Sequence, residues 1–80
     1  MSVTILFFGP LRTLAGTDEI QVDAPLDWAG LVAAVGPDVA EQLDSERVHV
    51  ACGGRVLADK HSLDAKDGDE VALLPPVSGG

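Results

Sequence analysis

The stretch VTILFF, residues 3–8, combines β-branched, aliphatic and aromatic side chains without a charge, and it stops at Gly9-Pro10. Such a run, bounded by residues that break strands, predicts a β-strand with apolar side chains on both faces. A second apolar run, Glu70–Leu74, follows the turn signal Asp67-Gly68 and ends at Pro75-Pro76, where proline has no N–H to donate to a strand ladder. We expect these two strands to lie side by side at the centre of a sheet.

The segments between these two runs show further strand patterns. Apolar and polar residues alternate within Glu19–Val22, which predicts a strand antiparallel to the first. Val48–Cys52 alternates in the same way, and Gly53-Gly54 then turns the chain into a short edge strand over Arg55–Ala58. Together with the two apolar runs, these segments predict a mixed sheet of about five strands.

A helical stripe separates the second and third predicted strands. Its apolar members, at spacings i, i+3, i+4 and i+7, are Trp28, Leu31, Val32 and Val35. Asp27 has the side chain of a helix N-cap, and Gly36-Pro37 ends the pattern. A second short helix is predicted over Pro37–Leu43, and a single helical turn over Leu11–Ala15. The order of elements predicts an α+β roll in which the sheet wraps one main helix.

Composition limits the class of protein. Eighty residues with 46% hydrophobic content suffice for one core, and the net charge of −8 disfavours nucleic acid and anionic membrane surfaces as partners. A basic protein is the expected partner. One cysteine cannot form an internal disulfide, which indicates a reducing compartment. MSVTILFFGP, residues 1–10, has no basic residue before its apolar run, so we interpret it as a strand and place the protein in the cytoplasm.

The body of the domain offers no convincing catalytic or metal site by sequence. His49, Cys52 and His61 are candidate metal ligands, but residues three apart on a strand point to opposite faces. Cys52 is therefore expected to pack as a small core residue. The acidic run around Asp67 lacks the ligand spacing of a calcium loop, and Gly53-Gly54 lacks the Lys-Ser/Thr of a phosphate loop. We predict no metal and no bound cofactor.

The end of the sequence, PPVSGG, is the unusual feature. We predict a domain over residues 1–74 and an extended, flexible tail over residues 75–80. Two successive prolines favour an extended chain, and six residues reach roughly 20 Å. Gly79 and Gly80 have no side chains, so this end can enter a narrow active site, where only the Gly80 carboxylate is left to react. Activation of that carboxylate requires an enzyme that converts it to a better electrophile, such as an acyl-adenylate.

Two blocks, FFGPLRTLAGT at residues 7–17 and DGDEVALLPPVSGG at residues 67–80, resemble the small, sulfur-carrying subunits of molybdopterin synthase, within the ubiquitin-like β-grasp proteins. The resemblance extends over nearly the whole chain. It differs at Gly53, where such a subunit is expected to carry asparagine after the third strand.

The resemblance implies a reaction at the tail. Gly80 would be adenylated with ATP by an E1-like activating enzyme and converted to a thiocarboxylate. The tail would then donate its sulfur to cyclic pyranopterin monophosphate in the active site of the large synthase subunit, and successive rounds would build the molybdopterin dithiolene. The chain would be the non-catalytic small subunit of a heterotetramer. The activating enzyme and the sulfur donor are not identified by the sequence.

The resemblance also implies a partner surface on the outward face of the two apolar strands, extended by the tail. Its predicted residues are Leu6, Phe8, Ala72, Leu74, Pro75, Pro76, Val77 and Ser78. An exposed apolar patch of this kind marks a protein contact. The alternative is that the chain's own loops cover this face.

Three other functions stay open at the level of sequence. A sulfur carrier of thiamine synthesis would share the fold and the activation step. A ubiquitin-like modifier would instead join Gly80 to lysines of target proteins. A non-covalent adaptor would use only its sheet, and would keep its function without Gly79-Gly80.

Overall fold

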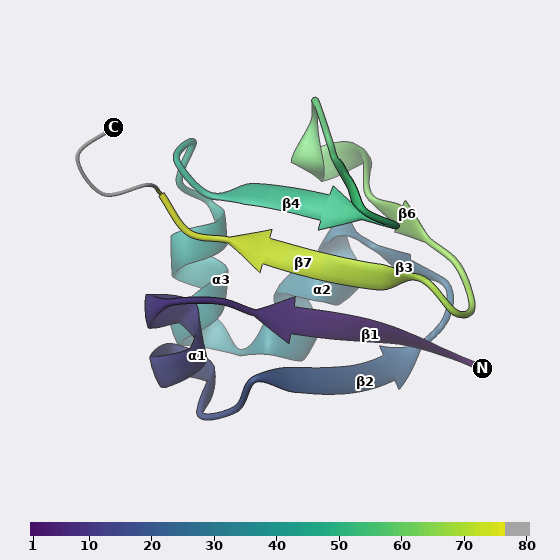
Figure 1. Cartoon of the computed structure of the whole chain (residues 1–80), viewed down its shortest axis with the longest axis horizontal. Coiled ribbons are helices and arrows are strands. Elements are labelled where there is room, and N and C mark those ends of the chain that lie inside the picture. The colour runs from purple at the N-terminus through teal and green to yellow at the C-terminus, as the bar shows by residue number, and fades with distance from the viewer. Residues whose placement is uncertain (77–80) are drawn as a thin grey trace.

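Residues 1–76, which the computed structural model describes, form a five-stranded mixed sheet with the helices packed on one face (Figure 1). The strand order is β2-β1-β7-β4-β5. The strands are β1 (Ser2–Phe7), β2 (Glu19–Asp23), β4 (His49–Cys52), β5 (Arg55–Val56) and β7 (Glu70–Leu74). The prediction of an α+β roll with a sheet of about five strands is confirmed.

The two apolar runs pair at the centre of the sheet, as predicted. β1 and β7 are parallel, with Ile5 opposite Val71 and Phe7 opposite Leu73. β2 joins the outer side of β1 in antiparallel orientation, and β4 joins β7 in the same way. Because β1 and β7 are parallel, their carboxyl ends meet at the same edge of the sheet. The start of α1 and Pro75, where the predicted tail begins, therefore lie at the same end of the central strands (Figure 1).

The helices are short, and their bounds follow the sequence signals. They are α1 (Pro10–Ala15), α2 (Trp28–Val35), α3 (Pro37–Leu43) and the single 3₁₀ turn η1 (Lys60–Ser62). The predicted cap of α2 is present, because an Asp27 side-chain oxygen accepts a hydrogen bond from the Gly30 N–H at 2.8 Å. Proline at the first position of both α1 and α3 preorganises the helix start without losing a helical hydrogen bond.

The core lies between the sheet and these helices. Val3, Ile5, Val71 and Leu73 point from the central strands to the helices, and each is fully buried. Leu31 of α2 is also fully buried, and Trp28 and Val35 pack against the core as the stripe predicts. Val32 is only partly buried, while Ala34, outside the predicted stripe, packs against the core. Burial of each large aliphatic side chain contributes about 1.5–3 kcal/mol.

Three small elements were absent from the sequence prediction. β3 (Leu26–Asp27) pairs with β6 (Asp64–Ala65) as a separate two-stranded sheet, and η1 precedes β6. Two-residue strands are too short to show a periodicity. The edge strand β5 ends at Val56, earlier than the predicted Ala58. Leu63, between η1 and β6, is buried.

Candidate functional site

The outward face of the sheet carries a row of apolar side chains that crosses four strands. Strand pairing places Leu6 opposite Ala72, Ala72 opposite Ala51, and Ala51 opposite Val56. Directly paired residues point to the same face, so these four side chains form one continuous line. We call this row, with Phe8 and Leu74, the sheet patch. Its members Ala51 and Val56 were missed in the sequence, because alternation gives their face but not the strand that they pair with.

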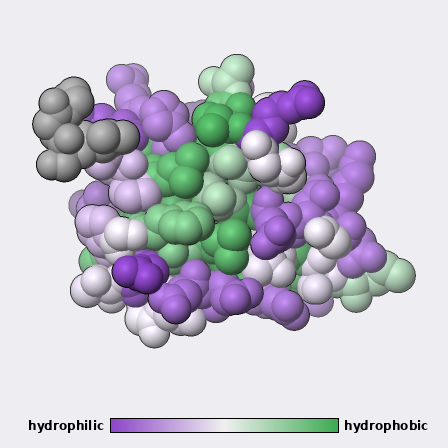
Figure 2. Space-filling view, in the orientation of Figure 1, coloured by the Kyte–Doolittle hydropathy of each residue, from purple (hydrophilic) through white to green (hydrophobic). Residues whose placement is uncertain are grey.

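The sheet patch is open to solvent except at Ala51, which is buried. The exposed fractions of Phe8 and Val56 are 44% and 54%, and Leu6, Ala72 and Leu74 are partly exposed. Figure 2 shows the apolar surface at the middle of this face, with hydrophilic residues around it. Within residues 1–76, the chain's own loops leave Phe8 and Val56 exposed, which favours the predicted surface over the alternative of a covered face.

Acidic and polar residues border the sheet patch on the β2 side. Glu19 is paired with Leu6, and Gln21 with Thr4. Glu70, at the start of β7, is also paired with Thr4 and is exposed. The net charge of −8 and the acidic residues around the sheet patch favour a partner protein whose contact surface is apolar at its centre and basic at its rim.

The predicted tail starts directly beside the sheet patch. Leu74 is the last residue of β7, Pro75 is partly buried, and Pro76 is exposed. Both prolines line a groove of about 420 Å³ together with Pro10 and Leu14 of α1. The other predicted tail residues, Val77, Ser78, Gly79 and Gly80, lie outside the described residues.

Cys52 packs toward the core rather than toward a ligand site. It is paired with the buried Val71, whereas His49 is paired with Leu74 on the outward face. The predicted opposition of these two side chains is thus confirmed. The Cys52 Sγ lies 3.8 Å from the Asp69 Oδ2. Burial raises the pKa of the Cys52 thiol, and the nearby carboxylates of Asp69 and Asp64 raise it further.

His61, the third candidate ligand, belongs to a different region. Its ring meets the Trp28 ring edge-on, with 4.6 Å between centroids, and its Nδ1 lies 3.2 Å from the Asp59 Oδ1. Within residues 1–76, no group of three or more His, Cys, Asp or Glu side chains is placed to hold a metal ion. Nor does any helix in that range have the length and apolar content to cross a bilayer.

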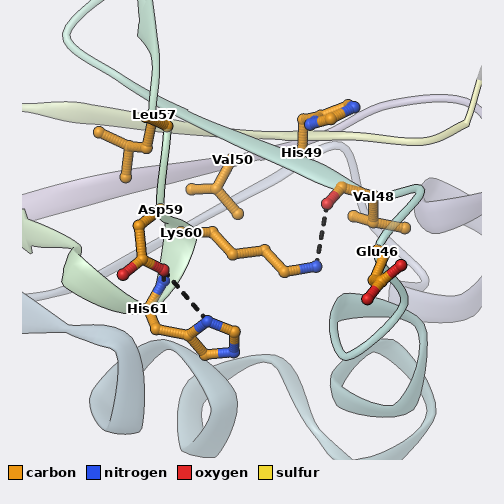
Figure 3. A pocket seen from close by; sticks show the side chains of 9 residues that line it. Glu46, Val48, His49, Val50, Leu57, Asp59, Lys60 and His61 are labelled. Carbon is orange, nitrogen blue, oxygen red and sulfur yellow. Dashed lines mark hydrogen bonds and ion pairs between the residues drawn. The ribbon is translucent and has the colours of Figure 1, made fainter.

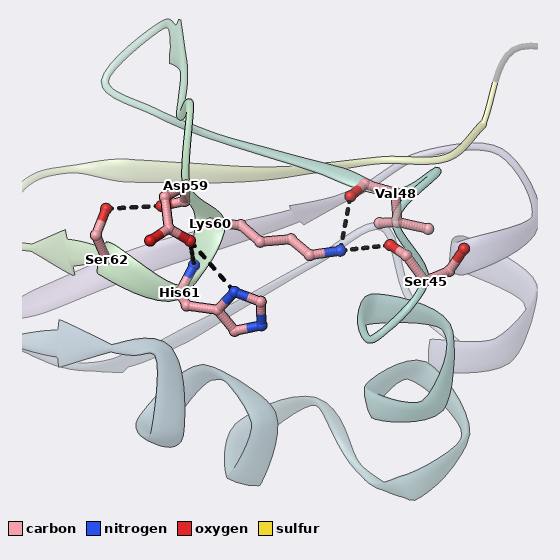
Figure 4. Close-up of polar contacts among 6 residues, drawn as sticks. All are labelled: Ser45, Val48, Asp59, Lys60, His61 and Ser62. Carbon is pink, nitrogen blue, oxygen red and sulfur yellow. Dashed lines mark hydrogen bonds and ion pairs between the residues drawn. The ribbon is translucent and has the colours of Figure 1, made fainter.

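A polar pocket beside η1 was not anticipated from the sequence (Figure 3). Lys60 extends along it and donates to the carbonyl oxygens of Ser45 and Val48, the latter at 3.0 Å (Figure 4). The Lys60 Nζ is also 5.9 Å from the Trp28 ring centroid. These contacts tie the α3–β4 connection to η1, so we interpret Lys60 as a structural cation rather than a reactive amine.

The chain is similar to a protein family and to individual proteins that are already known. A family model described as "ThiS family" matches residues 5–80. The chain is 35% identical over 82 residues to a "Molybdopterin synthase sulfur carrier subunit" of Escherichia coli (strain K12), and the match covers 98% of this chain and 99% of the relative.

Two solved structures are similar over their full length. One is a chain of a protein–protein complex of subunits 1 and 2 of molybdopterin-converting factor from Helicobacter pylori 26695, with 29% identity and a TM-score of 0.70. The other is SAMP1 from Haloferax volcanii, with 30% identity and a TM-score of 0.73. Each match covers 100% of both chains. These similarities support the ubiquitin-like β-grasp fold predicted above.

Proposed function

The chain belongs to the ThiS family, and on that basis we propose that it is a sulfur carrier of molybdopterin synthase, loaded and discharged at Gly80. One observation carries the proposal. The match to the relative named as a sulfur carrier subunit covers 98% of this chain and 99% of the relative, and the family model matches residues 5–80, a range that includes Gly79-Gly80.

Loading has two steps at the Gly80 carboxylate. A carboxylate oxygen attacks the α-phosphorus of ATP, which forms an acyl-adenylate and releases pyrophosphate. A sulfur nucleophile at the oxidation level of hydrosulfide then attacks the acyl carbon, and AMP leaves with the original oxygen. The product is a thiocarboxylate. No electron is gained or lost, because one oxygen is replaced by one sulfur.

Discharge requires an acceptor and a partner. The thiocarboxylate sulfur attacks a side-chain carbon of cyclic pyranopterin monophosphate and displaces an oxygen substituent from it, so a carbon–sulfur bond replaces a carbon–oxygen bond. Water then cleaves the acyl carbon–sulfur bond, which leaves the sulfur on the pterin and returns Gly80 to a carboxylate. General acid and base groups come from the large subunit, because this chain presents only its end. ATP is a substrate of an E1-like activating enzyme and is not held here.

The sheet patch is proposed as the surface that binds the large subunit. The Helicobacter pylori neighbour was solved as a complex of its two subunits, which supports a partner of this kind. Leu6, Phe8, Ala72 and Leu74 would be buried in the contact, and residues 75–80 would continue from it into the partner's active site. We propose a heterotetramer built from pairs of small and large subunits, working in the cytoplasm.

Intact mass spectrometry tests the loading step. The chain is incubated with an activating enzyme, ATP and sulfide, and we expect a product in which one oxygen at Gly80 is replaced by sulfur. A variant with one alanine added after Gly80 is the control, because the addition blocks the reactive end and leaves the sequence of residues 1–76 unchanged. A wild-type mass unchanged under conditions that load the Escherichia coli relative would contradict the proposal.

A ubiquitin-like modifier is the second candidate. The similarity to SAMP1, which belongs to the small archaeal modifier proteins, favours it, because the same acyl-adenylate could be captured by a lysine amine. Conjugates that persist on a denaturing gel and disappear when Gly80 is deleted would support this role. The thiamine alternative is distinguished by the acceptor, because it predicts sulfur transfer into thiazole and none to cyclic pyranopterin monophosphate.

A further inference from the structure

The connection between β1 and α1 is a tight turn that requires glycine. The Leu11 N–H donates to the Phe8 carbonyl oxygen at 3.1 Å, which closes a four-residue turn over Phe8–Leu11. Gly9 occupies its first central position with φ 55° and ψ −135°. These angles are close to those of a type II′ turn, in which an L-residue with a side chain is strained.

Gly9 also lies against the root of the tail. A Cβ atom placed on Gly9 would be 3.2 Å from the Pro75 Cγ, which is closer than an ordinary van der Waals contact. The other glycines with positive φ, which include Gly16 and Gly36, have no atom within 4 Å of such a Cβ. Among the described glycines, Gly9 therefore combines a positive φ with a close neighbour, and that neighbour is the residue where the tail begins.

Packing sets the position of Pro75 more than hydrogen bonding does. β7 ends at Leu74, and the Pro75 nitrogen has no hydrogen to donate. Pro75 is nonetheless partly buried, and it shares the groove wall with Pro10, the residue that follows Gly9. Pro75 thus packs against the Gly9-Pro10 turn.

We infer that Gly9 is a positioning residue for sulfur transfer, because its missing side chain lets Pro75 pack against the α1 turn and so fixes where the tail leaves the sheet. The inference rests on the proposed function at Gly80. A side chain at residue 9 would displace Pro75 by a few tenths of an ångström and so change the position from which the chain leaves the sheet. Reactions at a positioned group are sensitive to such displacements.

Gly36 offers a matched control. Like Gly9 it has a positive φ, precedes a proline and opens a helix, but it has no neighbour that a Cβ would meet. Gly9→Ala and Gly36→Ala should both lower the free energy of unfolding, because both strain the backbone. Only Gly9→Ala should slow sulfur transfer.

The test uses thiocarboxylated chain, the large subunit and cyclic pyranopterin monophosphate. For Gly9→Ala we expect the rate at saturating large subunit to fall about fivefold, well below the roughly 100-fold loss that a 1 Å displacement can cause. The KM for the carrier should change less than about twofold, since the sheet patch is intact. Gly36→Ala, measured where it is fully folded, should retain the wild-type rate.

A double variant distinguishes a positioning role of Gly9 from a general loss of activity caused by a strained fold. In the Pro75→Ala background the Cγ that meets residue 9 is absent, so adding Gly9→Ala should cost less than about twofold in rate. Equal losses in Gly9→Ala and Gly36→Ala, or the same fivefold loss in the Pro75→Ala background, would overturn the inference. Failure of wild-type chain to transfer sulfur at all would instead refute the proposed function.

Discussion

Leu73 and Leu74 are consecutive residues of β7, but only Leu73 is fully buried, whereas Leu74 points outward and stays partly exposed. Ile5 and Leu6 on β1 differ in the same way. The inner face is enclosed by helices, and the outer face is open (Figures 1 and 2). Two residues of equal hydrophobicity therefore have different environments, because strand alternation places one in the core and the next on the open outer face.

The largest expected effect comes from an identical change on the two faces. Leu73→Ala should lower the free energy of unfolding by about 2–5 kcal/mol, since it leaves a cavity in the core. Leu74→Ala should lower it by less than about 1.5 kcal/mol, because the lost methyl groups are partly in water already. Urea unfolding followed by Trp28 fluorescence measures both. Equal losses would show that the two faces are not distinct.

Charge on the outer face should affect binding rather than folding. Phe8→Asp is expected to weaken binding to the large subunit about 30-fold or more, or about 2 kcal/mol, because a desolvated apolar contact is replaced by a carboxylate. Titration calorimetry measures the affinity, and urea unfolding measures the stability.

Ala33→Asp is the matched control for Phe8→Asp. Ala33 is exposed on α2, on the helix side of the sheet, so the variant adds the same charge away from the sheet patch. It should bind as wild type does. Unchanged binding by Phe8→Asp would remove the sheet patch from the proposed interface.

The smallest expected effect concerns Cys52 at the margin of the core. Its pKa is raised above the ordinary value of 9.0, first by burial and then by Asp69, so little thiolate is present near neutral pH. Alkylation by iodoacetamide should be slower than in the unfolded chain at the same pH, and Asp69→Asn should speed it. Mass spectrometry of the alkylated chain measures both rates. Equal rates for Asp69→Asn and wild type would contradict the role of Asp69.

The raised pKa of Cys52 also determines the sign of the pH dependence of the stability. Because the folded pKa of Cys52 is above the unfolded one, the neutral thiol favours folding at pH values below the unfolded pKa. This contribution is lost as the pH rises through the folded pKa. Cys52→Ser should therefore flatten the fall in stability above pH 9, and an unchanged slope would count against the shift.

The sequence was sufficient to locate a helix or strand wherever a pattern of side chains repeats along that element. The apolar runs of β1 and β7, and the Asp27 cap with Leu31 in α2, were all located from local chemistry. β3 and β6 were missed, because two residues carry no period and their pairing depends on the rest of the fold.

The candidate site was predictable to a similar degree. Leu6 and Phe8 followed from alternation, whereas Ala51 and Val56 required the pairing register of β4 and β5. The approach of Gly9 to Pro75 depends on parallel pairing of two strands far apart in sequence. The roles of Val77, Ser78, Gly79 and Gly80 stay predictions.

The transfer of sulfur from Gly80 in a single turnover tests the central claim most directly. Thiocarboxylated chain, labelled with radioactive sulfur, is mixed with the large subunit and cyclic pyranopterin monophosphate in the absence of ATP. We expect the label to appear in the pterin while the chain returns to the mass of its carboxylate form. Label that stays on the chain, or that leaves without entering the pterin, would contradict a carrier that delivers its sulfur from Gly80.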